Sequence, residues 1–90
     1  MVMIRVEYPL FMKMVMISDV DVLPEHGIDQ IRELILNDVW DKFGSAFGVE
    51  RHGSAHQVEI MQNNTKIENT EEMRKCMKLC QDFQVIFQHP

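Results

Sequence analysis

The sequence lacks several features that would place it in a specialised class of protein. It has only two cysteines, Cys76 and Cys80, too few for the disulfide framework of a small secreted domain. Charged residues interrupt the apolar N-terminus at Arg5, Glu7 and Lys13, so no uncharged run approaches the ~18 residues of a membrane span. We therefore expect no signal peptide and no membrane anchor, and we expect reduced thiols in a cytoplasmic protein.

Basic residues are also scarce. The chain has 9 lysines and arginines against 14 aspartates and glutamates, and its formal net charge is -5. An acidic protein is poorly suited to bind a phosphate backbone and better suited to meet a basic partner. A sheet that binds nucleic acid normally does so through exposed aromatic side chains on its central strands, and there the sequence offers Met14, Met16 and Ile67 instead. Direct nucleic-acid binding is not expected.

What remains is the composition of an ordinary globular domain. Hydrophobic residues make up 46% of the chain and charged residues 26%, which argues against disorder, coiled coil and collagen. A chain of 90 residues forms one domain that can bury ~60% of its unfolded surface. We therefore expect a single domain over residues 1–90.

The negative charge is concentrated in one third of the chain. Between Asp19 and Glu50 there are eight acidic residues against Arg32 and Lys42, a local net charge of -6. The eight are Asp19, Asp21, Glu25, Asp29, Glu33, Asp38, Asp41 and Glu50. The remainder is nearly neutral, with a basic group later in the chain at Arg74, Lys75 and Lys78. The pattern predicts an acidic side and a smaller basic patch.

The strongest helical periodicity runs from Leu23 to Phe43. At about 100° per residue, one apolar arc contains Ile28, Ile31, Ile35, Val39 and Phe43. The opposite face contains Asp29, Gln30, Glu33, Asn37 and Asp41, while Leu36 and Trp40 extend the apolar arc at its margin. Pro24 suits a first helical turn and Gly44 suits the stop. This segment is expected to be an amphipathic helix with an acidic outer face.

The remaining periodic segments read as strands and a second helix. Alternation predicts a strand over 2–8 and another over 12–17, either two strands or one strand bent at Pro9, followed by an acidic loop over 18–22. Asn63-Asn64 favours a two-residue turn that pairs Gln62 with Thr65 and Ile60 with Ile67. A helix then begins after the expected N-cap Thr70, and a final strand covers 83–88.

This order of elements indicates an α+β fold. We expect a small ferredoxin-like β-α-β-β-α-β sandwich, with an antiparallel or mixed sheet, two helices on one of its faces and an extra N-terminal strand segment.

No catalytic, metal or cofactor motif in the sequence is specific. His52 and His56 flank a short Gly-Ser-Ala stretch, but zinc needs three or four convergent ligands and no third one has a defined spacing. The serines lack the strand-Gly-x-Ser-x-Gly-helix context of an activated nucleophile. We expect no metal site, no cofactor and no enzymatic activity.

A partner-binding surface is instead expected on the central helix. Its residues are Asp29, Glu33, Leu36, Asn37, Trp40 and Asp41. An aromatic side chain edged by carboxylates suits a partner that presents arginine or lysine. Half-burial of Trp40 against residues 44–54 is an equally good interpretation of that residue.

The run LPEHGID at residues 23–29 resembles the start of the first helix in DinI-like proteins, small bacterial and phage regulators of the DNA-damage response. Residues 58–67 are similar to the hairpin of that family and residues 70–80 to its second helix. The resemblance implies a non-enzymatic protein that contacts a recombinase filament through an acidic second helix. This chain differs there, because its second helix is basic, its first is acidic, and a closing strand is added.

The sequence therefore predicts a small acidic regulatory protein, an inhibitor or adaptor that binds a basic surface of a protein partner, with no membrane contact. A homodimer formed through an edge strand is a second hypothesis about its partners. The alternative function is a small-molecule-binding domain or small enzyme with its site in residues 44–56, using His52, His56 and Glu50.

Overall fold

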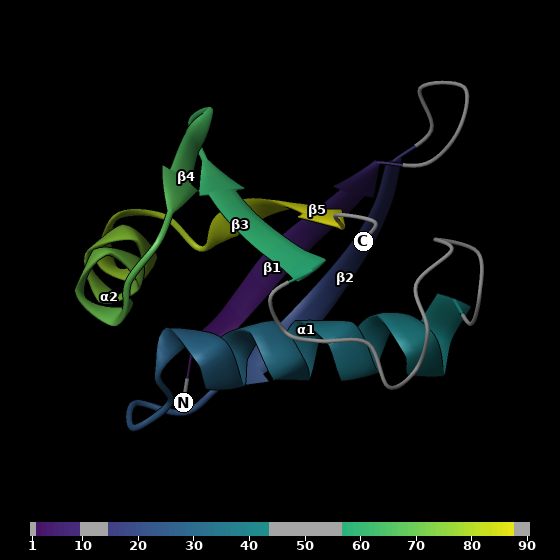
Figure 1. Ribbon diagram of the computed structural model, residues 1–90, viewed down its shortest axis with the longest axis horizontal. Helices are drawn as coiled ribbons and strands as arrows, with labels where there is room; N and C mark the ends of the chain where they lie inside the picture. Colours follow the sequence, from purple (N-terminus) through teal and green to yellow (C-terminus); the bar gives the residue numbers. More distant parts are fainter. Residues whose placement is uncertain (1, 10–14, 44–56, 88–90) are drawn as a thin grey trace.

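The computed structural model describes residues 2–9, 15–43 and 57–87 as a sheet with two helices (Figure 1). The elements are β1 (Val2–Pro9), β2 (Val15–Val22), α1 (Ile28–Phe43), β3 (Val58–Gln62), β4 (Thr65–Ile67), α2 (Thr70–Leu79) and β5 (Asp82–Phe87). The predicted α+β class is confirmed. In Figure 1, α1 lies along one face of the sheet.

The five strands form one mixed sheet in the order β2-β1-β5-β3-β4. β1 is antiparallel to β2 and parallel to β5, while β3 is antiparallel to both β5 and β4. The first and last strands of the chain are thus neighbours in the middle of the sheet. A helix held against a mixed sheet with this order and this parallel contact is the arrangement known as the β-grasp.

The ferredoxin-like topology is not confirmed. In that sandwich the strand before the first helix lies inside the sheet, whereas here β2 is an edge strand that pairs with β1 alone among the strands described. Alternation of apolar residues shows which face of a strand is buried, but it carries no information about the neighbouring strand. The order of helices and strands along the chain was therefore predictable from the sequence, but the choice of neighbouring strands in the sheet was not.

β1 and β2 are two separate strands. Their register runs without a break from Val2 opposite Val22 to Pro9 opposite Val15, which settles the question left open at Pro9. The prediction of an acidic loop over 18–22 is wrong, because those residues belong to β2. Val20 and Val22 face the core while Asp19 and Asp21 face solvent, so the acids occupy the outer side of a half-buried strand.

α1 begins four residues later than Pro24. Residues 23–26 form a turn in which the His26 N–H donates to the Leu23 carbonyl at 3.1 Å and the Leu23 N–H donates to His26 Nδ1 at 3.0 Å. Proline fits this turn as readily as a first helical turn, since both need a φ near −65°. Gly27 then caps the helix, and Gln30 Oε1 accepts from its N–H at 2.8 Å.

Asn69, and not Thr70, caps α2. Its side-chain oxygen accepts from the Glu72 N–H at 2.9 Å. Thr70 Oγ1 instead accepts from the Ile28 N–H at 3.0 Å, satisfying a donor in the first turn of α1. The starts of the two helices are therefore joined by a hydrogen bond between residues 42 positions apart.

The predicted hairpin at Asn63-Asn64 is confirmed. Both asparagines have positive φ, 52° and 61°, and the pairs Gln62–Thr65 and Ile60–Ile67 are those expected. Positive φ at both central positions is typical of the type I′ turn, whose twist matches the strands.

Both helices contribute to one core. Its buried members from the strands are Ile4, Val6, Tyr8, Val20, Val22, Val58, Ile60, Ile67, Phe83 and Val85; those from the helices are Ile28, Ile31, Ile35, Leu36, Val39 and Met73. The other face of the sheet is open to solvent and mixes exposed apolar side chains, Met3, Ile17 and Ile86, with charged ones. The two helices also present a solvent-facing side, and the candidate binding surfaces are the outer face of α1 and the outer face of α2.

Candidate functional site

The outer face of α1 carries most of the residues predicted to bind a partner. Asp29, Glu33, Asn37 and Asp41 are all exposed, as the helical periodicity requires. They recur at intervals of four residues and so form one stripe along the helix. We call Asp29, Glu33, Asn37 and Asp41 the acidic stripe.

Leu36 and Trp40 do not belong to this stripe. Leu36 is only 3% exposed and lies in the core, so it has no surface to offer a partner. Trp40 is half-buried and packs against the same core, and its indole N–H is buried with no hydrogen-bond partner among the described residues. Leu36 and Trp40 extend the apolar arc of α1 as predicted, but the helix packs against both β2 and β3, so this margin faces the core instead of a partner.

The charge of the stripe is lower than the sequence suggested. Arg32 Nη1 lies 3.3 Å from Asp29 Oδ1 and partly neutralises the first turn. Asp19 and Asp21, which account for part of the local charge of -6, lie on the opposite face of the sheet. Asp19 is also paired with Arg5, with 3.6 Å between Oδ1 and Nε. The described acidic residues between 19 and 43 are therefore divided between two faces.

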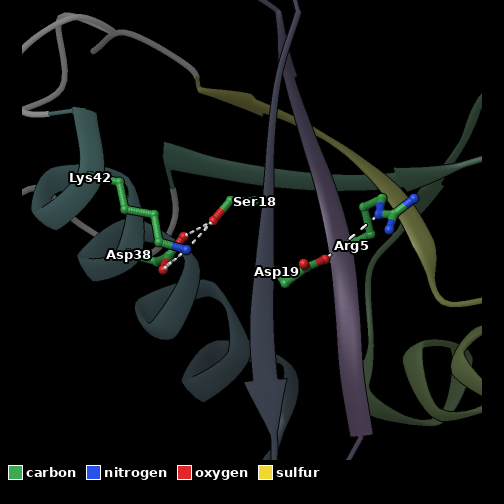
Figure 2. A network of polar contacts seen from close by, with 5 residues as sticks. All are labelled: Arg5, Ser18, Asp19, Asp38 and Lys42. Carbon is green, nitrogen blue, oxygen red and sulfur yellow. Dashed lines mark hydrogen bonds and ion pairs between the residues drawn. The ribbon is translucent and has the colours of Figure 1, made fainter.

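A polar cluster lies behind the stripe, where α1 meets β2 (Figure 2). Ser18 Oγ donates to Asp38 Oδ2 at 2.5 Å and accepts from Lys42 Nζ at 2.7 Å, and Lys42 Nζ lies 3.2 Å from Asp38 Oδ1. Burial, and in addition the negative charge of Asp38, raise the pKa of Tyr8 far above its ordinary value. The cluster joins the C-terminal half of α1 to the sheet.

This cluster resembles a serine–lysine pair, but its geometry does not favour nucleophilic catalysis. Ser18 Oγ donates its proton to the Asp38 carboxylate and accepts from Lys42 Nζ, so the lysine is not placed to take the hydroxyl proton as a general base would. Ser18 is also only 5% exposed, so a substrate has little access to its hydroxyl. The contacts fit a structural role, with each polar group satisfied by the other two.

The exposed side of α2 carries two acids in its first turn, Glu71 and Glu72, and three bases after them. Arg74, Lys75 and Lys78 are all exposed, and none has a carboxylate within ion-pair distance among the residues that the structure describes. The predicted separation into an acidic and a basic region is therefore present, on α1 and α2.

The two cysteines of α2 are both free thiols. Cys76 is partly buried against the core, as expected of a small apolar residue, but Cys80 is exposed at the C-cap of the helix. Its N–H donates to the Cys76 carbonyl at 2.9 Å, which ends the helix.

Several predicted site residues lie outside the described part of the chain. These are His52, His56 and Glu50, which the alternative function requires. Within residues 2–9, 15–43 and 57–87, no group of three or more His, Cys, Asp or Glu side chains is arranged to hold a metal ion. None of the helices in these ranges is both long and apolar enough to cross a membrane.

Sequence reasoning missed the contact of Ser18 with Asp38 and Lys42. The spacing of Asp38 and Lys42, four residues apart on a helix, is visible in the sequence and favours an ion pair. Nothing local marks Ser18, which lies 20 residues before Asp38.

Comparison with known families and curated proteins does not identify this site. The sequence matches no known protein family, and no curated protein resembles it closely enough to count as a relative.

Proposed function

We propose that this protein is a small cytoplasmic, non-enzymatic regulator that binds a protein partner through the acidic stripe of α1. The observation that carries the proposal is the run of exposed Asp29, Glu33, Asn37 and Asp41 along one helix, backed by a buried apolar face that holds the helix rigidly against the sheet. A rigid charged surface needs little ordering when it binds, so more of its interaction energy appears as affinity.

The partner in this proposal presents a basic surface. Opposite charges steer encounter and select against partners of the wrong sign. The resemblance to DinI-like regulators makes a recombinase, whose basic surface otherwise holds nucleic acid, the first candidate. The basic face of α2 sets this chain apart from that family, so the proposed contact is made by α1 and not by the second helix.

The test compares two charge-altered variants on a column. Wild-type protein, a Glu33→Lys/Asn37→Lys variant and an Asp21→Lys variant are immobilised, and proteins retained from a cell extract are eluted by salt and identified by mass spectrometry. Asp21 is an exposed acid on the outer face of the sheet, so its variant, which raises the net charge by two units against three for the double variant, is a control for most of the change in net charge.

A partner of the proposed kind is retained by wild type and by Asp21→Lys, and is lost by Glu33→Lys/Asn37→Lys. Its affinity falls steeply between about 50 mM and about 500 mM salt, because the Debye length shortens over that range. The purified recombinase is then measured in the same way. Retention that is equal on all three columns, or insensitive to salt, would sink the proposal.

A further inference from the structure

A groove lies between α2 and the start of β1. It is lined by Val2, Pro24, Arg74, Met77, Lys78 and Gln81, and its volume is about 440 Å³. Small-molecule sites commonly occupy ≈ 300–1,000 Å³. In Figure 1, α2 and the start of β1 lie toward the same end of the molecule, away from the C-terminal end of α1. The groove is thus separate from the C-terminal half of the acidic stripe.

Hydrogen bonds tie the walls of the groove to one another. The Arg5 N–H of β1 donates to the Gln81 carbonyl at 2.7 Å, and Gln81 Nε2 donates to the Met77 carbonyl at 2.5 Å. Arg74 Nη2 donates to the Pro24 carbonyl at 3.4 Å. The groove is therefore formed by the fold itself, from three segments that are distant in sequence.

The groove is lined by apolar side chains, Val2, Pro24 and Met77, together with two cations, Arg74 and Lys78. Arg74, Met77 and Lys78 occupy one face of α2, at helical spacings of three and four residues. Among the lining residues that the structure describes none is acidic, and no described carboxylate lies within ion-pair distance of Arg74 or Lys78. In a protein of net charge -5, this is a local positive site.

We propose that this groove binds a small organic anion, a carboxylate attached to a short apolar chain. The chain packs against Val2, Pro24 and Met77, and the carboxylate lies between Arg74 and Lys78. Arginine and carboxylate make charge-assisted hydrogen bonds, and the guanidinium has donors beyond the one used at Pro24. The site goes beyond the proposed function, which uses α1 alone.

Methionine methyl resonances provide a direct test. The protein is labelled at the methionine methyl groups and titrated with octanoate. The Met77 signal is expected to shift in a saturable manner. Met73, fully buried in the core, and Met3, exposed on the outer face of the sheet, are internal controls and should not move. Acetate lacks the chain and octan-1-ol lacks the charge, so each should bind more weakly than octanoate.

Variants of α2 then test the charges. Arg74→Gln and Lys78→Gln are each expected to weaken octanoate binding by about two- to five-fold, the range for one exposed ion pair. Lys75→Gln removes the same charge from an exposed position that does not line the groove, and should leave the affinity unchanged. Arg74→Lys keeps the positive charge but loses the hydrogen bond to the Pro24 carbonyl, so it should retain most of the affinity for octanoate if the charge is what matters.

The proposal is overturned if octan-1-ol shifts Met77 at the concentrations at which octanoate does, because the cations would then play no part. A Lys75→Gln effect as large as that of Lys78→Gln would also overturn it, as would the absence of any Met77 shift on saturation with octanoate. Backbone amide spectra of each variant establish that the fold is intact.

Discussion

The cluster of Ser18, Asp38 and Lys42 allows a sharp prediction about stability. Ser18→Ala removes a hydroxyl that donates to Asp38 at 2.5 Å and accepts from Lys42 at 2.7 Å, in a residue that is 5% exposed. Asp38 keeps its ion pair with Lys42 at 3.2 Å, so the substitution leaves no isolated charge. Only the link between α1 and β2 is lost.

The magnitude follows from the burial of the three groups. A hydrogen bond to a charged group contributes ≈ 1.5–3 kcal/mol when buried. The Lys42 side chain is 47% exposed and Asp38 19%, so solvent can replace part of what is lost. We expect Ser18→Ala to lower the free energy of unfolding by about 1–2 kcal/mol, with a fall in Tm of roughly 5–12 °C for a domain of this size.

Urea unfolding followed by Trp40 fluorescence measures this change. The matched control is Asp19→Asn, the next residue of β2 (Figure 2). Asp19 pairs with Arg5 at 3.6 Å, but both side chains are about half exposed, 51% and 57%, so its loss should cost under about 0.5 kcal/mol. A double-mutant cycle of Ser18→Ala with Asp38→Asn should show coupling of about 0.5–1.5 kcal/mol. Equal costs for Ser18→Ala and Asp19→Asn, or no coupling, would refute the reasoning.

Two further predictions concern titration and helix capping. Because burial raises the pKa of Tyr8, its phenol stays protonated in the folded protein as the pH passes about 10, while the unfolded chain releases that proton. The contribution of Tyr8 to the free energy of unfolding should be fully present below about pH 10 and decline above it. The chain has a single tyrosine, so its phenolate absorbance should appear only at the pH at which Trp40 fluorescence reports unfolding. Phenolate absorbance from a protein that is still folded would contradict this prediction. Asn69→Ala and Thr70→Val should each cost about 1 kcal/mol, but the amide resonance of Glu72 should shift in the first and that of Ile28 in the second. A Thr70→Val variant that disturbs Glu72 and spares Ile28 would restore Thr70 as the cap of α2.

Local features of the fold were predictable where a single principle dominates. Positive φ at Asn63 and Asn64 follows from asparagine's tolerance of the left-handed region, and the hairpin register follows from the turn. Ile28, Ile31, Ile35 and Val39 are all buried because the period of the helix determines their common face.

Features that depend on a neighbour in space were not predictable. Residues 18–22 read as a loop because of their acids, yet pairing with β1 makes them a strand. Leu36 lies at the margin of the apolar arc, and only the contact of α1 with both β2 and β3 decides that it is buried. The groove at α2 could not be anticipated either, since Val2, Pro24 and Gln81 are adjacent only after the sheet has formed.

The acidic stripe was predictable in part. Helical period alone placed Asp29, Glu33, Asn37 and Asp41 on one exposed face. It could not show that Asp19 and Asp21 lie on the opposite face of the sheet, because that depends on residues 18–22 being part of β2 and not a loop. The sequence therefore overstated the charge available at a single surface.

The central position of β5 has a consequence for the order in which this protein folds. β1 with β2, and β3 with β4, are antiparallel pairs that can form from neighbouring residues, but within the sheet the two pairs are hydrogen-bonded to each other only through β5. Contacts between residues distant in sequence form slowly, because the intervening chain must first be ordered. During synthesis α1 can contact both pairs, but the sheet stays divided until Phe83 and Val85 have left the ribosome, and until then the strand edges of β1 and β3 that β5 will occupy can pair with other chains.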